Sequence, residues 1–258
     1  MSAQLAALYS SGDHLAAAAA ALAAGLVNAV AGGGTLITFP VLVALGVPNV
    51  HANVTNAVAL CPGYFGGTWA QRADLAQQRA RARALVLPAV LGGLTGSILL
   101  VASSEKLFKS IVPFLILAAC ALLAFQDAIK KRLPPRRAES RAAVSPALYV
   151  SAFVATVYGG YFGAGLGIIL LAVLGVALPD PLPRLNALKQ LLSAVTNVCA
   201  ALFFLFSGKV VWSLALAMAP ASLIGGQIGG RVAGRIPPKP LRAIVIAFGV
   251  AVAVKALL

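Results

Sequence analysis

Apolar residues along this chain come in long runs separated by short polar segments. Several of these runs approach the roughly 20 residues that an α-helix needs to cross a bilayer, while three are clearly shorter. No alternation of polar and apolar positions accompanies them, as it would in an outer-membrane barrel. The pattern predicts an all-α, polytopic transmembrane helical bundle. Its ten runs cover residues 15–30, 36–45, 52–69, 84–101, 108–125, 147–158, 166–178, 185–206, 210–228 and 241–258.

Two of the short runs begin with glycines. The segment AGGGTLITFPVLVALG, residues 31–46, has three glycines, an apolar stretch broken by Pro40 and a final glycine. The segment GAGLGIILLAVLG, residues 163–175, is a fainter copy of it. Interrupted apolar segments at corresponding places of two halves are typical of the substrate site in a transporter with inverted repeats. Each short run and its neighbour could span twice or form a re-entrant hairpin, and the sequence leaves this open.

A shift of 133 positions superimposes much of the second half on the first. The glycine-rich starts align instead at a shift of 129, with Gly34 opposite Gly163, which implies four extra residues near 179–182. We therefore predict a first transmembrane repeat over 1–127, a basic linker over 128–145 and a second repeat over 146–258, in opposite orientations. The pairs that support the shift of 133 are Asn53 with Asn186, Gly92 and Gly93 with Gly225 and Gly226, Gly96 with Gly229, Lys106 with Lys239, and Lys109 with Arg242.

The composition excludes a soluble fold. The chain is 60% hydrophobic and 10% charged, whereas soluble domains carry about 25% charged residues. The net charge of +14 would indicate a nucleic-acid partner in a soluble protein, but membrane topology explains it here, and we expect no such partner. The run 15–30 has no Lys or Arg before it, so we interpret it as a retained membrane segment and not as a signal peptide.

Basic residues are divided unequally between the two sides of the predicted bundle. The sparse side has Lys106, Lys109, Lys209 and Lys255, and Lys189 lies inside an apolar run. Since Lys and Arg accumulate in cytoplasmic loops, we expect the rich side to be cytoplasmic and both termini to lie outside. The rich side has Arg72, Arg79, Arg81, Arg83, Lys130, Lys131, Arg132, Arg136, Arg137, Arg141, Arg184, Arg231, Arg235, Lys239 and Arg242.

The glycine clusters offer a site for an anion. A glycine run that opens a short helix leaves backbone N–H groups free, and the helix dipole adds partial positive charge there. Two such starts, facing each other from opposite sides, would bind a negatively charged group. Alternatively, the glycines only allow helices to pack closely. The candidate residues are Gly32, Gly33, Gly34 and Thr35 in the first half, and Gly163 and Gly165 in the second.

Polar residues inside the apolar runs supply further candidates, because they are costly in a bilayer and tend to face a cavity. Asn186, Lys189, Gln190 and Asn197 recur at helical spacing and form one stripe. Asn53, Thr55 and Asn56 stand at the matching helix start, and Asn28 and Tyr158 neighbour the glycine clusters. Contacts between helices without a ligand would also explain these residues. Lys189 could equally extend its ammonium group back to the cytoplasmic surface.

The remaining reactive side chains argue against other activities. All six carboxylates fall in loops or at the ends of runs, which favours an anionic substrate over a cation. Cys61, Cys120 and Cys199 lack the spacing of a metal site, so we expect no metal and no cofactor. No catalytic constellation lies within the runs, so we do not expect an enzyme.

The order GLVNAVAGGGTLITFPVLVALGVPNVHANVTNAVAL, with YGGYFGAGLGIILLAVLGVALPDPLPRLNALKQLLSAVTN in the second half, resembles the TauE/SafE sulfite exporter family. The family's first motif falls on Gly32, Gly33, Gly34 and Pro40, and the second on Gly163, Gly165 and Gly175. The second copy departs from the pattern, with Ile169 at the proline position and Ala164 between the glycines.

The resemblance implies a duplicated, multi-pass permease of the bacterial inner membrane that exports sulfite or an organosulfur anion. The expected partners are the lipid bilayer and a small anionic substrate, and association as a homodimer is left open. A carrier for an unrelated neutral metabolite or cation, with the glycines serving only in packing, is the alternative.

Overall fold

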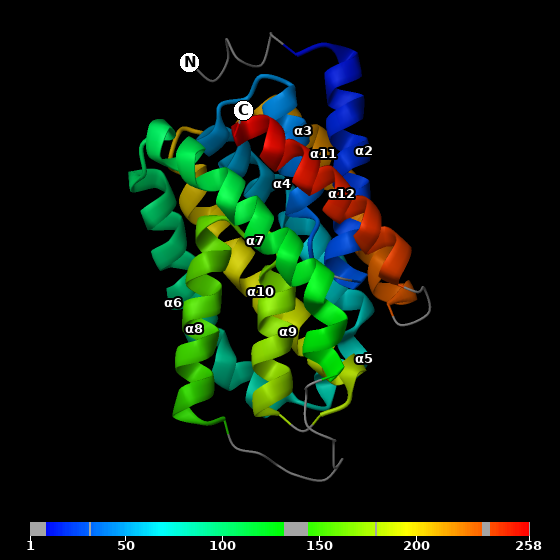
Figure 1. The fold of residues 1–258 in the computed structure, drawn as a ribbon. Helices are drawn as coiled ribbons and strands as arrows, with labels where there is room; N and C mark the ends of the chain where they lie inside the picture. Colours follow the sequence, from blue (N-terminus) through cyan, green and yellow to red (C-terminus); the bar gives the residue numbers. More distant parts are fainter. Residues whose placement is uncertain (1–8, 31, 132–143, 179, 234–237, 258) are drawn as a thin grey trace.

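The computed structural model of the protein describes residues 9–30, 32–131, 144–178, 180–233 and 238–257 (Figure 1). Within these residues the chain forms eleven helices and no strand, which confirms the all-α fold. The start of α2 and the end of α12 lie at the same end of the bundle. The helices are α2 (Ser11–Val30), α3 (Thr35–Ala44), α4 (Asn49–Ala70), α5 (Arg72–Ala76), α6 (Arg79–Ala102), α7 (Glu105–Lys131), α8 (Pro146–Tyr161), α9 (Leu166–Ala177), α10 (Leu182–Leu205), α11 (Trp212–Val232) and α12 (Pro238–Leu257).

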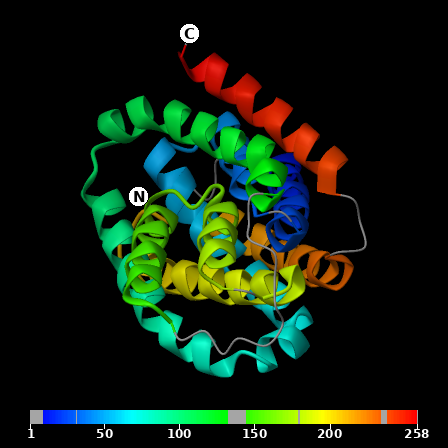
Figure 2. The same cartoon turned by 60° about the horizontal axis from the view of Figure 1, so that its bottom comes forward.

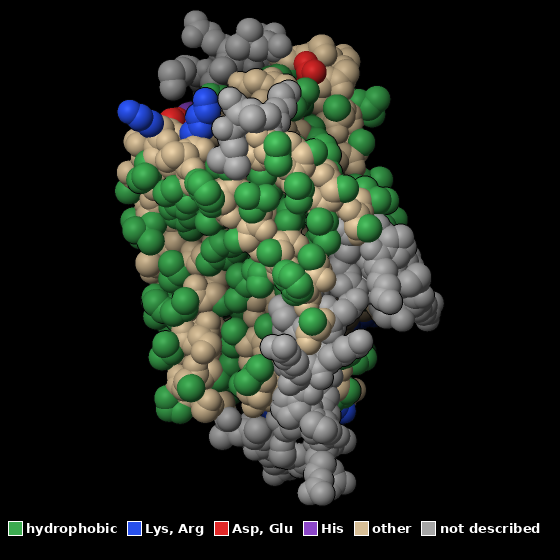
Figure 3. Space-filling view, in the orientation of Figure 1, with side chains coloured by type: hydrophobic (Ala, Val, Ile, Leu, Met, Phe, Trp, Pro, Cys, Tyr) green, Lys and Arg blue, Asp and Glu red, His purple; other side chains and the backbone are tan. Residues whose placement is uncertain are grey.

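The flank of the bundle is built to contact lipid. Within α2, α6, α7 and α10 lie segments long and apolar enough to cross a membrane. Large apolar side chains such as Leu87, Phe114 and Val150 are each more than 60% exposed. Figure 3 shows hydrophobic side chains over the flank of the face in view, with the visible charged groups near its two ends. The protein is therefore a multi-pass membrane protein.

The two short helices reach only partway across a membrane. At 1.5 Å per residue, the 10 residues of α3 and the 12 residues of α9 span about 15 and 18 Å, against about 30 Å for the hydrocarbon core. In Figure 1, α3 returns toward the end from which α2 descends, and α9 returns toward the end from which α8 rises. Each pair is therefore a hairpin with one short arm.

Corresponding helices of the two halves begin at corresponding positions. α4 and α10, α6 and α11, and α7 and α12 each begin 133 residues apart, as the alignment predicts. The short helices differ: α3 begins after Gly34 and α9 after Gly165, a separation of 131 and not 129. Gly32 and Gly163, also 131 apart, both have positive φ. Because these conformations define the turn, they give the register more reliably than the number of glycines does.

The contacts between helices also correspond when the two halves are exchanged. α2 packs on α11 as α8 packs on α6; α4 packs on α11 as α10 packs on α6; and α3 contacts α12 as α9 contacts α7. α4 also packs against α10, and α7 packs against α12 on the outside of the bundle (Figure 2). A two-fold axis between the halves would produce this set of pairs. The inverted repeat stays a prediction.

Glycines let the central helices approach closely. A Cβ on Gly93 would lie 2.8 Å from the carbonyl oxygen of Thr196, and one on Gly226 would collide with the carbonyl oxygen of Gly63. Gly63 and Thr196 are themselves 133 positions apart. Both contacts require the absence of a side chain, as small-residue packing of membrane helices predicts.

The predicted boundary at residue 127 does not coincide with a helix end. α7 continues through Asp127 to Lys131. Lysines near a helix C-terminus are favourable for the helix dipole, which explains why the polar sequence stays helical. The rest of the predicted linker, up to residue 143, lies outside the described residues.

Candidate functional site

The two glycine-rich turns meet inside the bundle. A Cβ built on Gly32 would lie 2.9 Å from the Cα of Gly167, and one built on Gly167 would lie 2.9 Å from the Cα of Gly32. Gly32 has a φ of 84°, a conformation that costs any other residue about 1–2 kcal/mol. The start of α9 thus contacts the turn that leads into α3, as the sequence predicts for two facing helix starts.

Local hydrogen bonds fix both turns. Asn28, near the end of α2, accepts a hydrogen bond on its Oδ1 from the backbone N–H of Gly34 at 2.7 Å. In the other half, the Tyr158 hydroxyl donates to the carbonyl oxygen of Ala164 at 2.6 Å. Within the described residues, the amides of Thr35 and Gly167 donate to no acceptor. The two helix starts therefore retain the donor capacity that an anion requires.

Polar side chains of α4 tie it to these turns. Asn56 accepts a short hydrogen bond from Thr38, and its Nδ2 donates to Oγ1 of Thr35 at 3.4 Å. Asn53 lies one turn earlier and donates to the carbonyl oxygen of Tyr161 at 2.8 Å. These bonds connect α4 of the first half both to α3 and to the end of α8 in the second half.

A small cavity lies between these groups. Its volume, measured as the space open to the centre of a water molecule, is about 10 Å³, which is close to the minimum for one water. Five predicted residues line it, from α3, α4, the turn before α9, and α10: Thr35, Asn53, Asn56, Gly163 and Asn197. The site is therefore polar and nearly filled.

Lys189 lies within the bundle, next to the glycine contact. Its side chain is only 2% exposed, so its ammonium group does not reach the surface. The Nζ atom donates to the carbonyl oxygen of Asn28 at 3.4 Å, and Cδ lies 3.4 Å from the position of a Cβ on Gly167. Lys189 therefore places a positive charge beside the contact between the two turns. The alternative of a lysine extended to the cytoplasmic surface is wrong.

The polar stripe on α10 continues on both sides of Lys189. Toward the helix start, Asn186 donates to Oε1 of Gln71 at 2.7 Å and to the carbonyl oxygen of Ala29 at 3.4 Å. Further along α10 are three buried groups for which the described residues supply no hydrogen-bond partner: both amide atoms of Gln190, the hydroxyl of Ser193 and Oδ1 of Asn197. Of these three residues, Asn197 lines the cavity. Buried polar atoms without partners are costly, and they typically mark sites for water or ligand.

Not every predicted residue belongs to this cluster. The Thr55 hydroxyl accepts from the backbone N–H of Val211 at 2.9 Å, so it fixes the start of α11 instead. A Cβ on Gly33 would make ordinary contact, at 3.4 Å, with the Leu123 side chain. Thr55 and Gly33 therefore belong to the predicted motifs but do not face the site.

Thr38 and Gln71 join the site although they were not predicted. Thr38 lies three positions after Thr35, a spacing that repeats on one helix face and could have identified it. Gln71 comes just after the last apolar residue of α4 and carried no such signal.

The carboxylates that the structure describes lie away from the two turns. Asp13, Asp74 and Glu105 belong to the first turns of α2, α5 and α7, and Asp180 precedes α10, where it pairs with Arg81. The side chains of Asp127 and Glu139 are outside the described residues. Within the part of the chain that is described, no group of three His, Cys, Asp or Glu side chains could hold a metal ion.

Comparison with known proteins agrees with this architecture. Residues 17–256 match the family described as "Sulfite exporter TauE/SafE". The chain is 29% identical to a probable membrane transporter protein of Haemophilus influenzae over 78% of each chain. It is also 29% identical to the probable membrane transporter protein ORF9 of a Sinorhizobium species, over 92% of this chain and 90% of that one. The chain therefore belongs to the TauE/SafE sulfite exporter family and is a multi-pass membrane transporter.

Proposed function

We propose that the protein transports a small sulfur-containing anion, such as sulfite or an organosulfonate, and that the anion binds where the two glycine-rich turns meet. The single observation that carries the proposal is the buried Lys189 beside the contact between Gly32 and Gly167. A buried cation, two helix N-termini and several amide side chains form a set of donors suited to oxyanions. The described carboxylates, which would attract a cation instead, lie elsewhere.

Transport requires that the site open alternately to the two sides of the membrane. A cavity of about 10 Å³ has room for about one water and is too small for a four-atom oxyanion, so the site would have to widen before an anion could enter. Contacts between the two halves occur at both ends of the bundle. At the end with α5, Arg81 pairs with Asp180. At the other end, the Ser103 hydroxyl is 3.2 Å from the Tyr161 hydroxyl.

We infer that the halves rock against each other as inverted repeats, breaking one of these sets of contacts at a time. The shared spacing of helix starts and the matching helix pairs support this inference.

The proposed direction is export. Fifteen of the twenty basic residues fall on one side of the predicted topology, and we place that side in the cytoplasm, with both termini outside. An interior-negative potential favours the outward movement of an anion by about 2.3 kcal/mol per charge per 100 mV. Net efflux then needs no coupled ion.

Flux in liposomes that contain the purified protein tests the proposal. Sulfite and sulfoacetate should move, faster when an imposed potential drives the anion outward, while a neutral solute and sodium should not. Lys189→Gln should reduce anion flux at least tenfold, because it removes the charge at the site. Lys109→Gln, which removes an exposed charge on α7, is the matched control and should leave flux unchanged.

Two results would contradict the proposal. If the purified protein elutes as a single species but moves none of the sulfur anions, the proposed substrate class is wrong. Normal flux in Lys189→Gln would reject the site and favour a carrier in which the glycines serve only in packing.

A further inference from the structure

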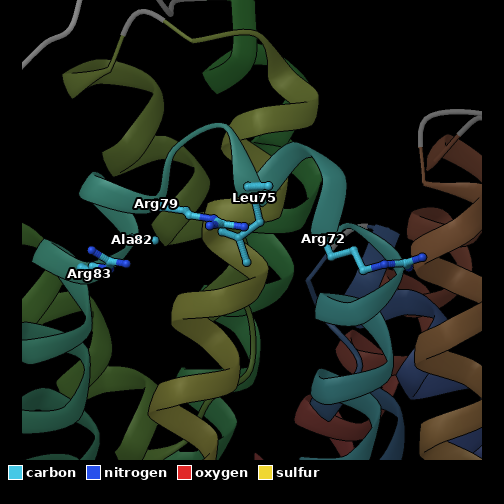
Figure 4. Close-up of a pocket in the computed structure, with 6 residues that line it drawn as sticks. Arg72, Leu75, Arg79, Ala82 and Arg83 are labelled. Atoms are coloured by element: carbon cyan, nitrogen blue, oxygen red, sulfur yellow. The ribbon is translucent and has the colours of Figure 1, made fainter.

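A second cluster of positive charge lies away from the proposed transport site, on the outside of the bundle. A groove of about 280 Å³ runs between α5 and the first turns of α6. Arg72, Arg79 and Arg83 line it together with the apolar side chains of Leu75, Ala76 and Ala82. Figure 4 shows Arg79 extending toward Leu75, with Arg72 and Arg83 to either side. The groove thus combines an apolar wall with arginine side chains.

The arginines of α6 divide into two groups with different surroundings. Arg81 turns inward and forms its ion pair with Asp180. Arg79 and Arg83 are exposed, and no hydrogen bond or ion pair joins either of them to another described residue. Asp74 is the carboxylate of α5, and none of the ion pairs among the described residues includes it. Two guanidinium groups on the groove are therefore available for an external anion.

An exposed tryptophan next to the groove indicates the level of the groove relative to the membrane. Trp69, at the end of α4, is 63% exposed, and the Arg72 guanidinium lies 4.9 Å from the centre of its ring. Exposed tryptophans of membrane proteins gather at the level of the lipid headgroups. The groove begins just beyond this residue, where α4 gives way to the short α5. Its arginines therefore lie at the level of lipid phosphates.

We propose that this groove binds an anionic membrane phospholipid, with the phosphate held by Arg79 and Arg83 and the acyl chains against Leu75 and Ala82. One guanidinium group can donate two parallel hydrogen bonds to the oxygens of a phosphate, whereas an ammonium group acts as a point charge. Arginine therefore suits a phosphate headgroup better than lysine does. A free phosphate ion would gain nothing from the apolar wall, so the combination favours the lipid. Basic pockets between membrane helices are known to accept anionic headgroups. The site is independent of the transported substrate.

Native mass spectrometry of the full-length protein in mild detergent tests the proposal with phosphatidylglycerol and phosphatidylcholine as probes. Phosphatidylglycerol should be retained preferentially. Each arginine near a membrane surface strengthens binding roughly fivefold, so Arg79→Gln with Arg83→Gln should weaken it about 25-fold. Arg79→Lys with Arg83→Lys keeps both charges but loses the paired N–H donors of the guanidinium groups, so its binding should lie between that of the unchanged protein and that of the double Gln variant, which excludes misfolding as the cause. Arg231→Gln, an exposed arginine of α11, is the matched control and should have no effect.

Inorganic phosphate and Leu75→Gln distinguish the lipid from a free anion. A lipid site should resist a large excess of inorganic phosphate, and Leu75→Gln should weaken it. Displacement by phosphate together with an unaffected Leu75→Gln variant would overturn the lipid assignment. Equal retention of phosphatidylcholine, or equal loss in Arg231→Gln, would show non-selective attraction and would also overturn it.

Discussion

The contact between the two glycine-rich turns predicts opposite outcomes for two neighbouring glycines. Gly32→Ala places a methyl group 2.9 Å from the Cα of Gly167 and forces a residue with a side chain to adopt a φ of 84°. The conformation costs about 1–2 kcal/mol and the overpacking about 1–3 kcal/mol. The free energy of unfolding should therefore fall by about 2–5 kcal/mol, and the two helix starts should move apart.

Gly33→Ala is the matched control for this prediction. Its methyl group would lie 3.4 Å from a flexible Leu123 side chain, and the backbone of Gly33 is not in the left-handed region. We expect its effect on the free energy of unfolding to remain below about 1.5 kcal/mol. It should also transport normally, because Gly33 does not face the site.

Unfolding by a denaturing detergent in mixed micelles measures both variants, and anion flux in liposomes measures the consequence for transport. Gly32→Ala should lose stability and flux together. If the two variants were equally stable and equally active, the turns would not be in close contact, and the proposed site would lose its geometric basis. A loss of the same size in both would show a general intolerance of the glycine run, with no special role for Gly167.

Three further substitutions test individual contacts through the free energy of unfolding in mixed micelles. Asp180→Asn breaks the largely buried pair with Arg81 and should cost about 3 kcal/mol; an unchanged value would show that the pair does not join the halves. Asn28→Ala removes the acceptor for the N–H of Gly34 and should cost about 1 kcal/mol, with reduced flux because the start of α3 loosens; normal flux would contradict this. Ser222→Ala removes a 2.8 Å hydrogen bond to α4 and should cost about 0.6 kcal/mol without affecting flux, and a flux defect would argue that the contact serves transport.

The polar residues of α10 show which parts of the site were predictable. Asn186, Lys189, Gln190 and Asn197 share one helix face because the helical period alone determines it. Lys189 lies beside Gly167 and Asn197 lines the small cavity, whereas the amide of Gln190 lies against Gly67 of α4. The partners of these residues were not predictable in the same way. Gln71 meets Asn186, and Asn28 meets Lys189, only because helices distant in sequence cross at those points.

Thr55 shows that a residue predicted for the site from its sequence position can lie outside it. By sequence it belongs to the polar start of α4 with Asn53 and Asn56, yet its hydroxyl binds the first turn of α11. Three residues separated by one or two positions point in different directions from a helix, so a polar cluster in the sequence need not remain one in space.

By itself, the sequence determined the membrane class, the helical content, the common spacing of 133 between corresponding helices and the uneven distribution of basic residues. All of these depend on hydropathy and periodicity, which act within a helix or between a helix and the bilayer. Only the tertiary structure decided that Gly32 touches Gly167, that Lys189 is enclosed, and that the cavity is nearly filled. These features depend on the crossing of helices from both halves, and the close approach of two backbones is a property of the assembled bundle.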